Sequence, residues 1–297
     1  MSLTIVDGPR RAFPRILLRP VPPAPRGRKP RTATVNHRIR TMPRGRARRE
    51  LSQNLLADGG VIARYARTAA VPGGLVVEAG AGDGRITAAL AAHAARVIAY
   101  EIDPVPAARL RRRCRALPHV TCVTGDLLAA RPPDAAFHLA GNIPFAATSR
   151  IVGWALGARS MESATLITQR EYARKRTGDY GRWSLLTVRT WPRFSWRLGA
   201  RVPRDRFRPV PRVDAAVLHL DRRDRPLVPP EAIPGYLHCV EVGFTGRGGT
   251  LHASLRTAHP RHRVDAALRA ADLPRATIVA HVHPDQWIAL ARVLHPW

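Results

Sequence analysis

The chain has 297 residues and a formal net charge of +28 at pH 7, because 49 Lys and Arg residues outnumber 21 Asp and Glu. A charge this large predicts a polyanionic partner. No run of 18 apolar residues occurs, so we expect no membrane span. Cys114, Cys122 and Cys239 form no CxxC pair, which favours a reducing cytoplasm and no zinc site.

Residues 1–49 differ in composition from the remainder of the chain. They hold 14 Lys or Arg, eight prolines and a single acid, Asp7. Such a segment cannot build a packed core, so we predict a disordered tail. Its charge leaves two alternatives open: a solvated tail, or a flexible electrostatic tether to RNA.

The next feature is a pattern of strand, tight turn and helix. The apolar run 75–77 is followed by Glu78, by Gly80, Gly82 and Gly84, and by an alanine-rich helical pattern over 86–95. Glycines let a flat ligand approach the turn backbone, and the helix directs unpaired N–H groups at it. This predicts a nucleotide-type cofactor loop. The glycine spacing differs from the dinucleotide fingerprint and follows a strand-end acid, which favours S-adenosylmethionine.

Three further apolar runs each lead to a polar residue. Glu101 follows the run 96–100, Asp126 follows 120–124, and Asn142 follows 137–140. Open α/β sheets bind ligands at the carboxyl ends of their parallel strands, so we expect these side chains along one edge. Glu101 is the residue expected to hold a ribose diol.

At the segment 142–145, Asn-Ile-Pro-Phe, the chain resembles the rRNA adenine N6-methyltransferases, and among them the Erm-type 23S rRNA enzymes of the actinomycete branch. The other matching segments are 51–56, 77–82, 101–103, 125–127, 169–183, 207–214 and 283–287. The resemblance covers about residues 50–297 and leaves the tail outside.

The resemblance implies an α/β architecture. A Rossmann-like, S-adenosylmethionine-dependent methyltransferase domain is expected over residues 50–225, after the tail 1–49 and before an all-helical RNA-binding domain over 226–297. The residues it implies for cofactor binding are Asn54, Leu56, Gly80, Gly82, Glu101, Asp126 and Asn142. Asp126 is expected to accept from the cofactor adenine amine, and Glu78 to orient the loop by accepting backbone N–H bonds.

The same resemblance makes Asn142, Ile143, Pro144 and Phe145 the catalytic segment. An adenine amine is a poor nucleophile because its lone pair is delocalised into the ring. The Asn142 side-chain oxygen and the Ile143 carbonyl are expected to accept its two N–H bonds and favour a more tetrahedral nitrogen. Pro144 fixes φ at the turn, and Phe145 is expected to stack on the target base.

Contacts to RNA are predicted at two places. Arg170, Arg174, Lys175 and Arg176 follow the strand candidate 164–168 and are expected to meet phosphates. Phe207 either clamps the opposite face of a flipped base or anchors its own loop; both alternatives stay open. For Trp183, Trp191 and Trp196, core or sheet positions are favoured over stacking on RNA.

Two histidines, His281 and His283, lack a third ligand at metal spacing, so no metal site is predicted. The sequence thus predicts a monomeric, cytoplasmic enzyme that methylates N6 of one adenine in 23S rRNA before ribosome assembly is complete. By the resemblance, this reduces binding of macrolide, lincosamide and streptogramin B antibiotics. The alternatives are a housekeeping 16S rRNA adenine dimethyltransferase and a non-catalytic rRNA-binding assembly factor. The pattern is compatible with one or two added methyl groups.

Overall fold

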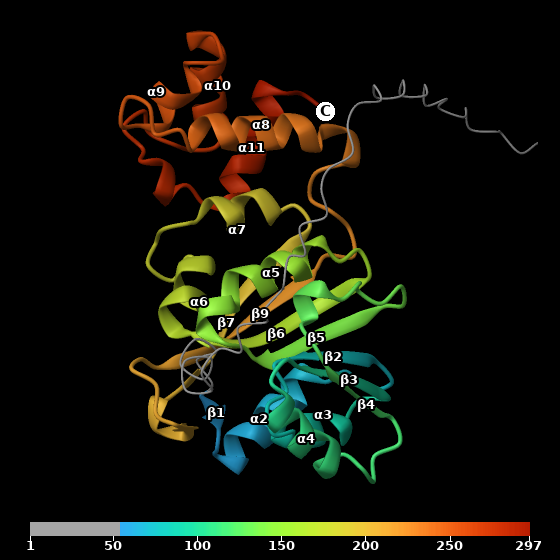
Figure 1. The fold of residues 1–297 in the computed structure, drawn as a ribbon. Coiled ribbons are helices and arrows are strands. Elements are labelled where there is room, and N and C mark those ends of the chain that lie inside the picture. The colour runs from blue at the N-terminus through green and yellow to red at the C-terminus, as the bar shows by residue number, and fades with distance from the viewer. Residues whose placement is uncertain (1–53) are drawn as a thin grey trace, which may run out of the picture. The chain divides into compact units, whose positions relative to one another are not determined.

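The structure is a computed structural model that describes residues 54–297 (Figure 1). These residues belong to a single compact unit of the chain. The predicted tail and residues 51–53 of the first matching segment lie outside the described residues. Within residues 54–297, no helix combines the length and apolar character needed to cross a membrane.

A seven-stranded sheet in the order β4-β3-β2-β5-β6-β9-β7 forms the centre of the fold. Its strands are β2 (Leu75–Ala79), β3 (Arg96–Glu101), β4 (Val120–Thr124), β5 (Phe137–Asn142), β6 (Met161–Gln169), β7 (Phe194–Val202) and β9 (Ala215–Arg222). The first five strands in this order, β4, β3, β2, β5 and β6, run parallel, whereas β9 is antiparallel to β6 and to β7. The chain runs outward from β2 to β4 and then returns to β5 on the other side of β2. The strand order therefore reverses between β2 and β5, which is where such sheets bind ligands.

Alternating side chains of the central strands enter two hydrophobic clusters, one on each face of the sheet. Val76 and Ala140 belong to the first cluster, and Val77 and Leu139 belong to the second. The first cluster includes residues of α2 (Gly59–Ala69), α3 (Arg85–Ala91) and α4 (Pro104–Arg113); the second includes residues of α5 (Thr148–Gly157) and α6 (Arg170–Arg176). The sheet is therefore covered by helices on both faces (Figure 1), which confirms the predicted α/β class.

The C-terminal residues build a third cluster. It is formed mainly by α8 (Ile233–Gly243), α9 (Leu251–Leu255), α10 (Arg261–Ala270) and α11 (Pro284–Leu294), around the fully buried Trp287. Val188 of α7 (Leu185–Thr190) also belongs to it, and its carbonyl accepts a 2.6 Å hydrogen bond from the Tyr236 hydroxyl. Helix α7 precedes residue 226, so this core reaches across the predicted domain boundary, which stays a prediction.

Candidate active site

Two adjoining cavities lie at the carboxyl ends of β2 and β5. The first is lined by Asn54, Leu55, Gly80, Gly82, Glu101, Ile102 and the segment from Asn142 to Phe145. The second shares Gly80, Ile102 and Pro144 with the first and is also lined by Asp126. Every residue predicted to bind the cofactor, with the exception of Leu56, therefore lines one of these cavities.

The glycine turn after β2 brings backbone to the cavity wall. Gly82 has a φ of +57°, and a Cβ there would lie 2.7 Å from Leu55 Cδ2. A side chain at this position would be strained and would displace Leu55. The turn is joined to β3 by the Ala81 N–H, which donates to the Tyr100 carbonyl at 2.9 Å.

Glu101 is fixed by the backbone at both of its carboxylate oxygens. Oε2 accepts from the Gly82 N–H at 2.7 Å, and Oε1 accepts from the Asp103 N–H at 2.9 Å. Burial raises the pKa of this carboxyl above its usual range despite the two backbone bonds. Each oxygen keeps a further lone pair, so a pre-positioned carboxylate can still accept from a pair of ligand hydroxyls.

Glu78 lies behind the turn and is fully buried. Its Oε2 accepts from the Thr87 hydroxyl at 2.5 Å, whereas Oε1 has no partner among the described residues. The prediction that Glu78 accepts backbone N–H bonds is wrong: its contact ties β2 to α3 through a side chain. Burial raises the pKa of Glu78 to about 8, with the nearby Glu101 adding to the shift.

Asp126 follows β4 and caps the short helix η1 (Leu127–Ala129). Its Oδ1 accepts from the Leu128 N–H at 2.9 Å. No hydrogen bond to Oδ2 is formed within residues 54–297, so an acceptor remains at the wall of the second cavity. Together with the glycine turn and Glu101, this acceptor makes the paired cavities suitable for a nucleoside.

The orientation of Asn142 is set by one hydrogen bond. Its Nδ2 donates to the Asn54 carbonyl at 2.7 Å, which leaves Oδ1 as the acceptor available at the first cavity. The next residue, Ile143, is held to the sheet by its N–H, which donates to the Ile167 carbonyl at 3.3 Å. Pro144 then ends the extended segment, and Phe145, half-buried, begins the short helix η2 (Phe145–Ala147) at the cavity wall.

Tyr65 positions this segment from behind, a role that the sequence pattern does not reveal. Its hydroxyl donates to the Thr165 carbonyl at 2.5 Å and accepts from the Gly141 N–H at 2.7 Å. At Gly141 the strands approach so closely that a Cβ would lie 2.3 Å from the Ala79 carbonyl oxygen. The sequence signal is only one tyrosine on the apolar face of a helix, which is the usual signature of a core residue.

A two-stranded ladder contributes one residue, Leu55, to the lining of the first cavity beside Gly82. Leu55 and Leu56 of β1 (Leu55–Leu56) pair with Arg208 and Phe207 of β8 (Phe207–Arg208). Because side chains alternate along a strand, Leu55 lines the cavity while Leu56 is buried in the core. A cofactor contact from Leu56 would therefore come from its backbone, and this contact stays a prediction.

Phe207 has no exposed surface. Of its two alternatives, the loop anchor describes this structure, and a base clamp does not, because the ring is enclosed by the first hydrophobic cluster. Near this anchor, the Arg206 guanidinium pairs with Asp58 at 2.7 Å, which joins the β8 segment to the start of α2.

A separate cleft is rich in arginine. Its lining comprises Gln169, Arg170, Glu171, Arg174, Tyr180, Arg201, Arg204, Arg212, Val213 and Asp214. Of the four predicted phosphate contacts, Arg170 and Arg174 line this cleft, and Lys175 is exposed beside them. Arg176 differs, because its guanidinium donates to the Ser184 hydroxyl at 2.8 Å and lies 4.8 Å from the centre of the Tyr172 ring.

Comparison with known proteins identifies the relatives of this chain. The model of a family described as ribosomal RNA adenine dimethylase matches residues 44–295. An rRNA adenine N-6-methyltransferase of Streptomyces fradiae is 56% identical over 254 residues, which cover 84% of this chain and 80% of that protein. The crystal structure of the 23S rRNA methyltransferase ErmE matches with a TM-score of 0.79 and 48% identity, over 81% of this chain and 99% of that one.

Two further relatives are less similar to this chain: a resistance protein and a small-subunit rRNA methyltransferase. The mycinamicin-resistance protein MyrB of Micromonospora griseorubida is 38% identical over 250 residues, 83% of this chain and 78% of that protein. A ribosomal RNA small subunit methyltransferase A of Phenylobacterium zucineum is 32% identical over 260 residues, 82% of this chain and 89% of that protein.

Proposed function

Because the chain belongs to the ribosomal RNA adenine dimethylase family, we propose that it methylates the exocyclic N6 of an adenine in 23S rRNA. The enzyme is an S-adenosylmethionine-dependent methyltransferase. The 23S substrate is supported by the 48% identity to ErmE, against 32% to a small-subunit enzyme. The observation that carries the proposal is the Asn142 amide, whose nitrogen is engaged by Asn54 and whose oxygen is left to accept at the cavity.

The lining of the paired cavities supports an assignment of residues to the parts of the cofactor. Glu101 would accept from the ribose hydroxyls, Asp126 would accept from the adenine amine, and the turn at Gly80 and Gly82 would admit the ligand to the backbone. When bound, S-adenosylmethionine supplies an electrophilic methyl group. The protein's own contribution is to hold this group and the base in fixed relative positions.

The segment from Asn142, the last residue of β5, to Phe145 would act on the target amine. Asn142 Oδ1 and the Ile143 carbonyl accept its two N–H bonds, which draws the nitrogen lone pair out of the ring toward the methyl donor. Phe145 stacks on the base and fixes its plane. The product amine is cationic and loses a proton to water, so no strong general base is required.

The target adenine has to leave its stack to reach this cavity, which costs a few kcal/mol and less for an unpaired base. Arg170 directly follows β6, the neighbour of β5, so the arginine-rich cleft begins at the same edge of the sheet as Asn142. We assign this cleft to the RNA backbone, with Lys175 beside it. The helices within 226–297 would add a second RNA-binding surface.

The biological consequence we propose is resistance to macrolide, lincosamide and streptogramin B antibiotics. It is supported by the 38% identity to MyrB, a mycinamicin-resistance protein. We further propose that the enzyme acts as a cytoplasmic monomer on 23S rRNA before ribosome assembly is complete. Three free cysteines among the described residues accord with a reducing compartment.

Asn142→Ala tests the catalytic part of the proposal. Loss of the acceptor should reduce methyl transfer at least about 100-fold, in the range of a lost transition-state acceptor or donor. Affinity for S-adenosylmethionine and for RNA should change much less, as measured by titration calorimetry and filter binding. Transfer near the wild-type rate would contradict the role of Asn142. Intact RNA binding without transfer in the wild-type protein would favour the non-catalytic assembly factor.

A further inference from the structure

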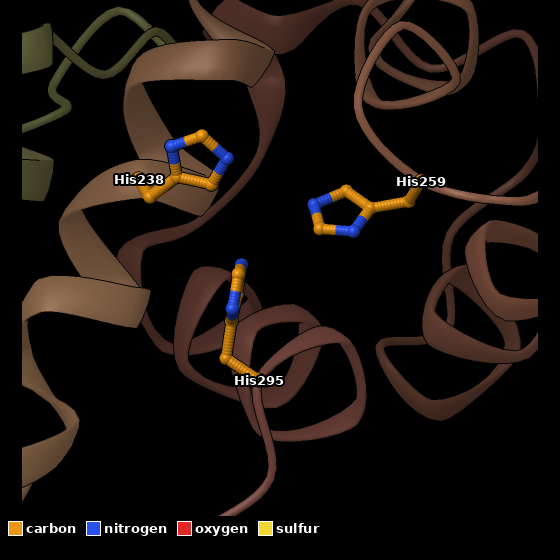
Figure 2. A group of neighbouring side chains, drawn as sticks. All are labelled: His238, His259 and His295. Carbon is orange, nitrogen blue, oxygen red and sulfur yellow. The ribbon is translucent and has the colours of Figure 1, made fainter.

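Three histidines come together in the C-terminal helical region. His238 lies in α8, His259 lies between α9 and α10, and His295 directly follows α11. Each histidine offers one potential ligand atom, and these three atoms all lie within 4.8 Å of one another. Figure 2 shows the three rings around a common centre, each with a nitrogen turned toward it.

Two of these rings are unsatisfied. The Nε2 atoms of His259 and His295 are inaccessible to solvent and have no hydrogen-bond partner within residues 54–297. Buried polar side-chain atoms are nearly always paired, so two orphaned nitrogens at one point indicate a missing ligand.

Neighbouring residues accommodate the cluster. Gly235 lies one turn before His238, and a Cβ there would lie 2.8 Å from His295 Cβ, so its lack of a side chain makes room for that ring. The Arg263 guanidinium donates to the Val293 and Leu294 carbonyls at 2.8 and 3.1 Å. Its hydrogen bonds are therefore directed at the end of α11.

We propose that His238, His259 and His295 bind one Zn²⁺ ion through one ring nitrogen each. Imidazole is a preferred ligand of zinc, and three protein ligands leave a fourth position for water. Nitrogens on a tetrahedral zinc lie about 3.4 Å apart, so the rings need to close by roughly 1 Å. Water can enter beside His238, which is exposed.

The ligand set consists of nitrogen alone. Cys239 adjoins His238 in the chain, but it is fully buried in the third hydrophobic cluster, and its sulfur is not among the ligand atoms gathered at this point. A zinc ion at this point would cross-link α8, the α9–α10 connection and the residue after α11. Binding should therefore stabilise the helical region. Sequence spacing does not reveal the site, because its ligands come from three separate elements.

The test is zinc titration of the full-length chain without a histidine tag, by calorimetry and by metal analysis after dialysis. We expect one equivalent per chain, a Kd in the micromolar range or tighter, and a Tm that rises with zinc concentration. His259→Ala and His295→Ala should each weaken binding at least tenfold. His281→Ala, an exposed histidine outside the cluster, is the matched control and should bind as wild type does.

His238→Gln serves as a second variant, because an exposed helical position tolerates it without loss of folding. It should also weaken zinc at least tenfold, and the Co²⁺-loaded wild type should show the visible absorption of a four- or five-coordinate ion that this variant lacks. The proposal is overturned by binding of clearly less than one equivalent, or by affinity in the variants equal to that of His281→Ala.

Discussion

The orientation of the polar side chains in the site is set by a few individual hydrogen bonds. The direction of the Asn142 amide follows from its bond to the Asn54 carbonyl, and Glu101 is oriented by two backbone N–H groups. Preorganised acceptors need no rearrangement when the substrate arrives, which is why fixed dipoles are effective in catalysis. Glu78 and Tyr65 lie behind these groups, and each leads to a prediction.

Glu78→Gln should remove a pH dependence of stability. Burial raises the pKa of Glu78 from the ordinary 4.5 to about 8, so the folded protein binds this proton more tightly than the unfolded chain does. The free energy of unfolding therefore falls as the pH rises through this interval. The neutral glutamine should raise the free energy of unfolding, and with it Tm, relative to wild type at pH 8; the gain is up to about 4 kcal/mol at pH 8 and small near pH 5.

Thermal unfolding at both pH values measures this effect, with the exposed Glu231→Gln as the control. An equal difference in Tm between variant and wild type at pH 5 and pH 8 would show that Glu78 is ionised in the folded protein.

Tyr65→Phe should lower both stability and methyl transfer. Without the hydroxyl, the Gly141 N–H and the Thr165 carbonyl lose their buried partner, at a cost of about 1–3 kcal/mol. The Asn142 segment then loses a support, and we expect kcat to fall roughly tenfold. Tyr236→Phe removes a single buried hydrogen bond, to the Val188 carbonyl, outside this segment. It should reduce Tm, although less than Tyr65→Phe does, and leave kcat unchanged; equal kcat in the two variants would refute the positioning role of Tyr65.

At the level of elements, the parallel strands were predictable because each is a short apolar run that ends in Glu78, Glu101 or another polar residue. Burial on both faces imposes this pattern, and the strand ends then place the ligand-facing groups. β7 was not predicted, because an edge strand with exposed arginines such as Arg197 resembles a basic loop. The ladder of β1 and β8 is only two residues long on each side.

Features without a local sequence pattern also include some residues of the candidate site. Glu101, Asp126 and Asn142 follow directly from strand ends. Tyr65 bonds to a backbone group 76 positions away, and Leu55 reaches the cavity through the register of a tertiary pairing. Contacts of this kind leave no local pattern in the sequence.

The arginine-rich cleft leads to a prediction about RNA binding that compares arginines of the cleft with arginines of α4. Arg170 and Arg212 line the cleft and are exposed, whereas Arg109 and Arg112 are exposed on α4, outside the cleft. The double substitution Arg170→Ala with Arg212→Ala should weaken RNA binding and reduce the slope of log K against log salt by about 1–2. Arg109→Ala with Arg112→Ala removes the same charge and should alter the slope much less. Equal slopes for the two pairs would show that only net charge matters.

For the whole molecule, charge is divided between the tail and the remaining chain. Residues 1–49 carry 14 basic residues and one acid, a charge of +13, which leaves +15 of the total +28 for residues 50–297. Both parts are therefore basic enough to attract RNA.

Deletion of residues 1–49 tests the tether alternative for the tail. If the tail contacts RNA, the deletion should reduce the salt slope by several units without changing kcat at saturating RNA. An unchanged slope would identify the segment as a solvated tail.

The central claim is tested most directly by methyl transfer from labelled S-adenosylmethionine to protein-free 23S and 16S rRNA, followed by mapping and mass analysis of the modified base. We predict N6-methylated adenine at one position of 23S rRNA, and the mass gives the number of methyl groups. Label on 16S rRNA instead, or on neither RNA despite cofactor binding, would contradict the proposed function.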